Sequence, residues 1–201
     1  MDLLLVLGFV LLAAFVSNVS PFFGASYTLI ATLQLSLVGF TPFNFAAIVL
    51  ASAVGATLAK VVIYYGAFGF KGFLKKNKNV QLIGRNSSSF KFYLILFGTA
   101  LMPVLPLDDF IYIGAGASGA SIGRMSAVTL LAKVLKSGVE IAVEFAILSS
   151  VGDVFGFDSV EATAALSVAF IVVGIGIYKL DWEKAYAKLR RKRGVERVSS
   201  G

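Results

Sequence analysis

The chain contains no cysteine and no histidine among its 201 residues. Without cysteine it can form no disulfide bond and has no thiolate nucleophile. Without histidine it lacks the commonest metal ligand and the side chain that most often acts as a base near neutral pH. We therefore expect no metal and no cofactor, and any proton carrier has to be an aspartate or glutamate or, less easily, a lysine or tyrosine.

Sequence motifs of the common enzyme classes are missing as well. The chain has no P-loop, no zinc-ligand spacing, no nucleophile elbow and no dinucleotide fingerprint. An ATP-driven or hydrolytic enzyme would have no residues with which to carry out its chemistry. The sequence therefore predicts that the protein is not an enzyme.

Charged residues make up only 14% of the chain, whereas 58% of its residues are hydrophobic and the mean hydropathy is +0.87. A soluble domain of this length could not bury so much apolar surface. We therefore predict an all-α integral membrane protein in which residues 1–180 form a single membrane domain. Its first apolar run, Leu3–Val16, lacks the basic start and the small-residue cleavage site of a signal peptide, so we expect a retained helix.

Prolines interrupt the apolar sequence at two places. Pro21 and Pro42 bound a first segment, which carries serine, threonine and glutamine in its interior. Pro103 and Pro106 divide a second segment, Phe90–Ser121. Proline breaks a helix, and irregular backbone is tolerated in lipid only where it is buried in protein or faces water. Both segments are therefore predicted to be re-entrant helical hairpins, which enter and leave the membrane on one side.

The other long apolar segments are predicted to be four transmembrane helices: Leu3–Val16, Phe43–Phe70, Arg124–Leu148 and Val160–Tyr178. Lys71–Lys91 is basic without any acid, whereas Val151–Glu161 is acidic without any base. Because basic loops stay in the cytoplasm, both termini are predicted to be cytoplasmic in a multi-pass protein of the cell (plasma) membrane. The hairpins then enter from opposite sides, the first from outside. Each precedes a helix with a mid-span lysine, which is the outline of an inverted repeat.

Basic residues also concentrate near the C-terminus. Asp181–Arg197 places Trp182, Tyr186 and Leu189 at helical spacing among lysines and arginines. This pattern is typical of a basic amphipathic helix lying on an anionic membrane surface. Anionic head groups of membrane lipids are therefore the expected partners and nucleic acid is not, and a homo-oligomer is compatible with the sequence. We interpret residues 198–201 as a remnant of cloning.

Four charged residues, Lys133, Lys136, Glu140 and Glu144, lie within one apolar segment at spacings of three and four. They therefore share one helix face, on which Lys136 is expected to pair with Glu140. Each unpaired charge near the middle of the bilayer costs about 2.5–3.5 kcal/mol, so this face must point towards protein or water. The stripe is either an ion-pair ladder that orients the helix or a substrate or proton pathway. We favour the pathway because intramembrane charges are mostly functional.

Asp108 and Asp109 follow directly after the second proline break. Lys133 is expected to pair with one of them, which would tie the hairpin to the next helix. One carboxylate could then carry a proton. The alternative is that the two acids cap the returning segment, and we predict Asp109 as the immediate N-cap of a helix from Phe110 onward.

Lys60 is the single charge within Phe43–Phe70. It either binds a phosphate oxygen, neutralises a carboxylate of the second half, or extends to the interface by snorkelling. Arg124 lies near a helix start on the predicted cytoplasmic side. It pairs either with a lipid phosphate or with Asp108 or Asp109, or it is a plain interfacial anchor, which is the interpretation we favour.

With these residues the chain resembles the DedA family, also called the SNARE-associated Golgi protein superfamily or VTT-domain proteins. The first half is similar to the family's proline-containing hairpin followed by Gly-x8-Tyr, here Pro21, Gly24, Gly55, Tyr64 and Gly66. The second half is similar to a branch with a Pro-x-Pro-Asp-Asp-type hairpin, here Pro103, Pro106, Asp108, Asp109, Ala115-Gly116, Gly123-Arg124 and Lys133. The resemblance covers roughly Ser17–Leu148.

Some positions depart from the family's pattern. The usual acids of the first hairpin are replaced by Asn18 and Ser26. The arginine that often precedes the second-hairpin proline is replaced by Ala100, and an aspartate common after the second-helix glycines is replaced by Lys60. If this chain keeps buried ion pairs of the kind the family has, other residues must supply the charges.

The resemblance implies movement of phospholipids or polyprenyl phosphates across the bilayer, with proton coupling in some members. We therefore predict a transporter, a flippase or scramblase of an anionic lipid. Lys60, Lys133 and Lys136 would neutralise the phosphate, while the acidic residues balance charge or carry protons. Two alternatives stay open. One is a transporter of small solutes, ions or protons, and the other is a non-transporting membrane scaffold that recruits partners through its basic tail.

Overall fold

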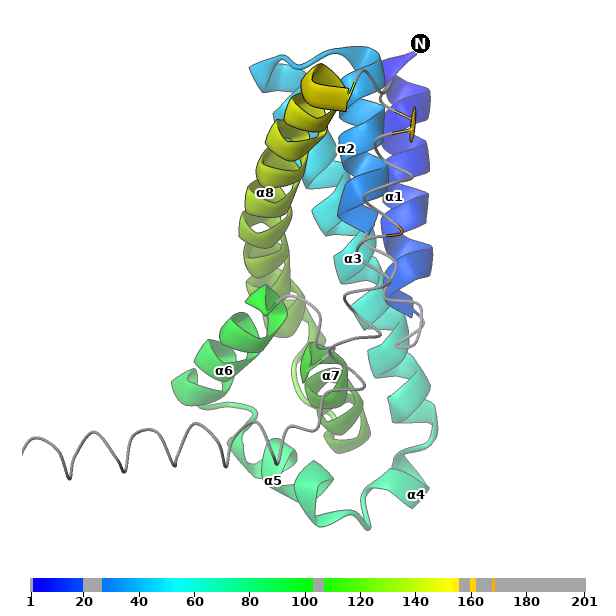
Figure 1. Cartoon of the computed structure of the whole chain (residues 1–201). Coiled ribbons are helices and arrows are strands. Elements are labelled where there is room, and N and C mark those ends of the chain that lie inside the picture. Colours follow the sequence, from blue (N-terminus) through cyan, green and yellow to red (C-terminus); the bar gives the residue numbers. More distant parts are fainter. Residues whose placement is uncertain (1, 20–26, 103–106, 156–159, 162–167, 169–201) are drawn as a thin grey trace, which may run out of the picture. The chain divides into compact units, whose positions relative to one another are not determined.

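The computed structural model describes residues 2–19, 27–102, 107–155, 160, 161 and 168 (Figure 1). The chain divides into two compact units, Met1–Ala162 and Thr163–Gly201. The described residues form helices and no strands, so the predicted all-helical class is confirmed. In chain order the helices are α1 (Leu3–Val19), α2 (Tyr27–Val38), α3 (Pro42–Gly69), α4 (Lys71–Leu74), α5 (Lys78–Asn86), α6 (Phe90–Leu101), α7 (Leu107–Ser118) and α8 (Ile122–Phe155).

Helix α3 begins and ends within one residue of the predicted Phe43–Phe70. Thr41 is its N-cap, and the threonine hydroxyl accepts a hydrogen bond from the Asn44 amide at 3.0 Å. Pro42 follows in the first turn, where its missing amide hydrogen has no helical partner to lose. In the described part of the chain, α3 is the one helix long and apolar enough to cross a membrane. The other spans and both re-entrant hairpins stay predictions.

Over the residues that the structure describes, three helices are shorter than a bilayer span. Helices α2, α6 and α7 have 12 residues each. At 1.5 Å per residue such a helix is about 18 Å long, whereas the hydrocarbon core is about 30 Å thick. Helix α1, with 17 residues, is at the lower limit of spanning length, and α8 has 34 residues. The three short helices therefore have the length expected for arms of re-entrant hairpins.

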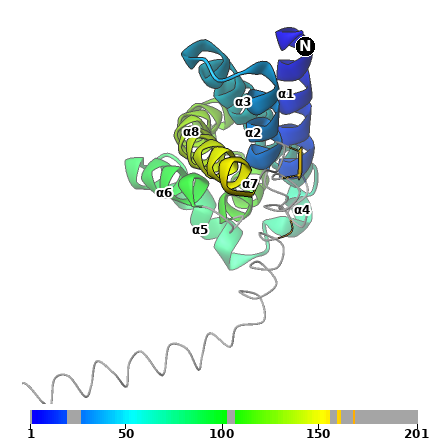
Figure 2. The ribbon, with the colours of Figure 1, turned by 45° about the horizontal axis from the view of Figure 1, so that its top comes forward.

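Helix α2 lies between α1 and α8, beside the upper part of α8 in Figure 1 (Figures 1 and 2). At the start of α2, the Tyr27 and Ser137 hydroxyls lie 3.2 Å apart. Farther along α2, the Thr32 hydroxyl donates to Glu144 at 2.9 Å. Residue numbers increase together on both helices, so α2 runs parallel to α8.

Helix α7 meets nearly the same part of α8 but runs the other way (Figure 1). At its start, Asp108 contacts Lys133, one turn from Ser137. Farther along, the Tyr112 hydroxyl donates to the Thr129 hydroxyl at 2.9 Å. The half-length helices α2 and α7 therefore begin at the middle of α8 and leave it in opposite directions.

The two halves of this unit repeat with a shift of 80 positions. Helices α2 and α7 end at residues 38 and 118, and α3 and α8 begin at residues 42 and 122. Gly39 and Gly119, which are also 80 apart (119 − 39), have φ angles of 84° and 77°, a backbone conformation that favours glycine. At this shift Lys60 corresponds to Glu140 and not to Lys133. The two mid-span lysines that suggested the repeat are therefore not counterparts.

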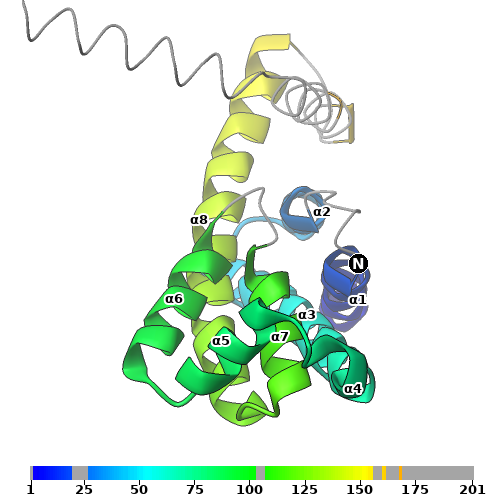
Figure 3. The ribbon, with the colours of Figure 1, turned by 90° about the horizontal axis from the view of Figure 1, so that it is seen from below.

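The predicted polar loop Lys71–Lys91 contains the two short helices α4 and α5. They lie at the same end of the unit as α6 and α7. This end faces the viewer in Figure 3. Asn77 is the N-cap of α5, and its side-chain oxygen accepts a hydrogen bond from the Asn79 amide at 2.8 Å. The sequence predicted a polar loop here and neither helix, because helices of four and nine residues are shorter than the window of roughly 11–18 residues in which helical periodicity is recognised.

Helix α8 is longer than the predicted Arg124–Leu148 and includes the first residues of the predicted acidic loop. The basic tail 181–197 and residues 198–201 lie outside the described residues, and so does the last predicted span, Val160–Tyr178, apart from residues 160, 161 and 168. The proline breaks Pro21, Pro103 and Pro106 also lie outside them.

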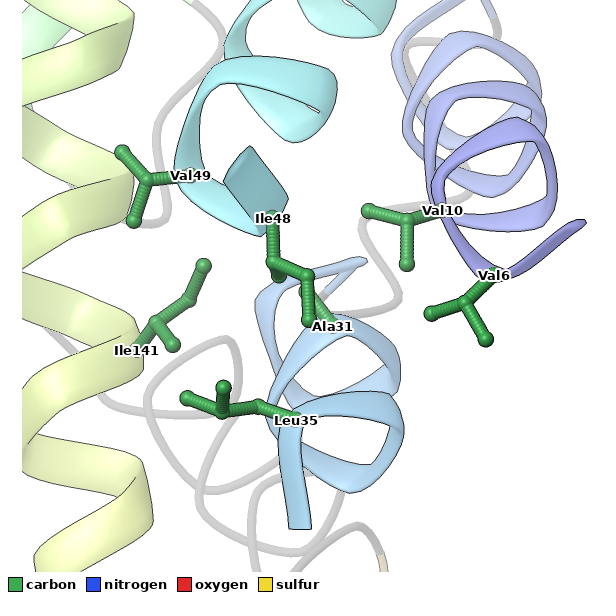
Figure 4. Close-up of a cluster of buried hydrophobic side chains, with 7 residues drawn as sticks. All are labelled: Val6, Val10, Ala31, Leu35, Ile48, Val49 and Ile141. Carbon is green, nitrogen blue, oxygen red and sulfur yellow. The ribbon is translucent and has the colours of Figure 1, made fainter. Parts of the chain in front are cut away.

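A cluster of buried apolar side chains joins α1, α2, α3 and α8, namely Val6, Val10, Ala31, Leu35, Ile48, Val49 and Ile141 (Figure 4). Helices α1 and α3 approach closely at Gly55, where a Cβ atom would meet the Leu11 carbonyl oxygen. Outward faces are apolar too: Leu131, Leu135 and Val139 of α8 are 64%, 55% and 65% exposed. Such helices, apolar on the inside and on the outside, suit a lipid environment.

Candidate functional site

Four charged side chains are buried together between α3, α7 and α8. Lys60 comes from α3, Asp108 and Asp109 from the first turn of α7, and Lys133 from α8. Each of the four residues is at most 4% exposed. A charge removed from water is tolerated only when a partner of opposite sign compensates it, so the packing of these helices depends on how the four groups pair.

The lysines and carboxylates form one continuous network. Asp108 lies between the two lysines, with its Oδ2 atom 3.0 Å from Lys133 Nζ and 3.7 Å from Lys60 Nζ. Lys60 Nζ also donates a hydrogen bond to Asp109 Oδ1. The predicted pairing of Lys133 with one of these two aspartates is confirmed. Of the three alternatives given for Lys60, the structure shows the one in which Lys60 neutralises carboxylates of the second half.

The predicted role of Asp109 as an N-cap is wrong. Helix α7 begins at Leu107, so Asp108 and Asp109 are both inside its first turn. The prediction started the helix at Phe110 because aspartate is a preferred N-cap residue. Both acids therefore lie near the N-terminus of α7, the positive end of its helix dipole.

Lys136 and Glu140 form a second, more open pair on α8. Lys136 Nζ lies 3.9 Å from Glu140 Oε1, and the two side chains are 14% and 28% exposed. Lys136 Nζ also donates to the Met102 carbonyl at 3.3 Å, directly after α6. The predicted pairing of Lys136 with Glu140 is therefore confirmed. The charged stripe thus divides into buried Lys133 and Glu144 and half-buried Lys136 and Glu140.

Glu144 belongs to a separate polar contact between α8 and α2. Its two carboxylate oxygens accept hydrogen bonds from the Thr28 hydroxyl at 2.7 Å and the Thr32 hydroxyl at 2.9 Å. Sequence reasoning did not assign roles to these threonines. Their spacing of four, which places both hydroxyls on one face of α2, was the signal that could have identified them.

Tyr112 and Thr129 join α7 to α8 by a hydrogen bond of 2.9 Å between buried hydroxyls. Combining Tyr112→Phe with Thr129→Val in a double-mutant cycle is expected to give a coupling energy of about 0.6 kcal/mol, the average for hydrogen bonds between membrane helices. Unfolding in detergent measures it. A coupling energy indistinguishable from zero would show that this bond does not hold α7 in place.

Arg124 lies near the start of α8 and is exposed. Within the described part of the chain its guanidinium forms no salt bridge with Asp108 or Asp109, since both carboxylates are held by lysines. The interpretation of Arg124 as an interfacial anchor is compatible with this position, and a contact with lipid phosphate stays a prediction.

The formal charges of Lys60, Lys133, Asp108 and Asp109 sum to zero. Because each lysine has a carboxylate partner, an arriving anion must take the place of a carboxylate. Protonation of Asp109 would leave Lys60 with only Asp108, at 3.7 Å, and protonation of Asp108 would release Lys133. The network can therefore exchange an internal ion pair for an external anion together with a proton.

Comparisons of the chain with protein-family models, with curated proteins and with solved structures found no match. The family resemblance noted in the sequence therefore stays a prediction. Functional inference has to start from the buried charges and the half-length helices that position them.

Proposed function

We propose that the protein is a membrane transporter that moves an anionic lipid, a phospholipid or a polyprenyl phosphate, across the bilayer as a flippase or scramblase. The observation that carries this proposal is the buried network of Lys60, Asp108, Asp109 and Lys133 inside a helical unit with an apolar exterior. A scaffold needs no such network, because an apolar core would hold the same helices at least as well.

A lipid phosphate needs cationic partners during its passage through the hydrocarbon core. Each uncompensated charge there costs about 2.5–3.5 kcal/mol on insertion scales. Among the described residues Lys60 and Lys133 are buried cations, and the half-buried pair Lys136 and Glu140 lies on the same face of α8 as Lys133. A phosphate can pass from Lys136 to Lys60 or Lys133 when protonation of Asp108 or Asp109 breaks the ion pair with that lysine.

The rest of a lipid molecule needs no enclosed path. Acyl chains can stay in the surrounding bilayer while the head group alone follows the polar face. The outer surface of the unit offers apolar side chains for this, including Leu131, Leu135 and Val139 on the side of α8 away from Lys133. A transporter of a water-soluble solute would instead have to enclose its whole substrate.

The proposal is tested by reconstituting the protein into liposomes with a fluorescently labelled anionic lipid and measuring how fast the label changes leaflet. Lys133→Ala and Asp108→Asn are each expected to slow transport at least about tenfold, because the phosphate loses a counter-charge or the lysine loses its resting partner. Unfolding of each variant in detergent is measured in parallel.

Asp2→Asn is the matched control, since Asp2 is exposed and its side chain accepts a hydrogen bond from the Leu4 amide, which asparagine can also accept. It should transport at the parental rate. If well-folded Lys133→Ala and Asp108→Asn proteins move lipid as fast as the parent, the site assignment is wrong. Proton-dependent flux of a small solute without any movement of lipid would instead favour the solute or ion transporter.

A further inference from the structure

A basic and apolar surface lies at the end of α3, on helices α4 and α5 and on the first residues of α6, and is called the α4–α5 surface below. Its cations are Lys71, Lys75, Lys76, Lys78, Arg85 and Lys91, and all six are exposed. Residues 70–91 contain no acidic residue that could neutralise them internally. We propose that this α4–α5 surface binds the anionic lipid head groups of a membrane leaflet.

Large apolar side chains are exposed among these cations. Phe70, Phe73, Leu82 and Phe90 are 72%, 80%, 62% and 75% exposed. A surface that mixes cations with exposed aromatic and leucine side chains fits an anionic membrane interface, where the rings insert between head groups and the amines meet phosphates. RNA or an acidic protein would match the charge but would leave most of this apolar area in water.

The α4–α5 surface is fixed to the buried part of the protein. On α5, Val80, Ile83 and Gly84 form the inner face. A Cβ atom added at Gly84 would meet Ser118 of α7, and one added at Gly114 of α7 would meet Ile83. The lipid-binding surface therefore packs directly against the helix that carries Asp108 and Asp109.

The opposite face of α5 carries the lipid contacts. Lys78, Leu82 and Arg85 follow one another at spacings of four and three, so they share one face, and all three are exposed. This pattern places a leucine between two cations that can reach head-group phosphates on either side. Together with Phe73 of α4, which is 80% exposed, these residues make up the part of the α4–α5 surface proposed to contact lipid.

The experiment uses the full chain with one fluorescent reporter. The chain has a single tryptophan, Trp182. Trp182→Phe combined with Phe73→Trp therefore moves the reporter to α4. This protein is reconstituted into nanodiscs of phosphatidylcholine with or without phosphatidylglycerol, and quenching by aqueous acrylamide is measured. Co-elution with the discs confirms insertion first, so failure to insert is distinguished from failure to bind anionic lipid.

Phosphatidylglycerol is expected to lower the acrylamide quenching constant at least about twofold, because each cation near an anionic surface strengthens binding roughly fivefold. About 1 M salt should abolish the difference, since the Debye length then falls to ~3 Å. Lys71→Gln, Lys75→Gln and Lys76→Gln together should also abolish it. The matched control carries Lys184→Gln, Lys188→Gln and Lys192→Gln, which remove the same charge from the tail and should keep the difference.

Several results would overturn the proposal. Equal quenching in the two kinds of nanodisc would show that anionic lipid does not contact α4. A difference that survives the three substitutions in residues 71–76 would assign it to another part of the chain. Protection by added RNA in neutral nanodiscs, without protection by phosphatidylglycerol, would identify the surface as a nucleic-acid site.

Discussion

Replacing Lys60 with methionine is expected to lower the free energy of unfolding by about 3–5 kcal/mol, because it leaves Asp109 buried without its counter-charge. Lys60 is 3% exposed and bonds directly to Asp109, so water cannot take its place. The second substitution Asp109→Asn should restore most of the loss. The doubly substituted site then holds no unpaired charge, and Asp108 keeps Lys133 at 3.0 Å. Denaturant unfolding in detergent measures both values.

Lys136→Met is the matched control for this prediction. Its partner Glu140 lies 3.9 Å away, and the two side chains are 14% and 28% exposed. A longer and more open ion pair contributes less, so the expected loss is below about 1 kcal/mol. Should Lys60→Met unfold no more readily than Lys136→Met, or should Asp109→Asn fail to restore it, the buried pair does not hold α3 and α7 together.

Gly116→Ala is expected to lower the free energy of unfolding by about 1–3 kcal/mol, because it overpacks the contact between α7 and α3. A Cβ atom at Gly116 would meet the Tyr64 carbonyl oxygen, which is backbone and cannot rotate away. Helix α7 must then move from α3, which separates Asp109 from Lys60. We therefore expect slower lipid movement in liposomes as well as lower stability.

Gly98→Ala is the control for the Gly116 substitution. Gly98 is also within a 12-residue helix, α6, but no atom lies within 4 Å of its added Cβ. Alanine in a helix interior is more favourable than glycine by roughly 0.5–1 kcal/mol, so this variant should be as stable as the parent or more so. Equal effects of the two substitutions would show that α7 and α3 are not in close contact.

The fold shows where local sequence patterns are informative. The bounds of α3 follow from Thr41-Pro42 and from the long apolar run behind them, and both signals are local. The 80-residue repeat, by contrast, is hardly visible in the residues themselves. Aligned residues often differ in chemical type, since Leu29 aligns with Asp109, Ala53 with Lys133 and Lys60 with Glu140. Backbone geometry at Gly39 and Gly119 reveals it, because similar packing needs similar bends rather than identical side chains.

Helical periodicity by itself determined that Lys133, Lys136, Glu140 and Glu144 lie on one face of α8, and it led to the pairing of Lys136 with Glu140. Only the tertiary structure decided that Asp108 lies between Lys60 and Lys133, and that Glu144 receives its hydrogen bonds from α2. The physical reason is the distance along the chain over which sequence periodicity carries information. A helix repeats every 3.6 residues, so the sequence specifies neighbours within a few turns. Contacts between residues 60 and 108, or 28 and 144, depend on how whole helices pack.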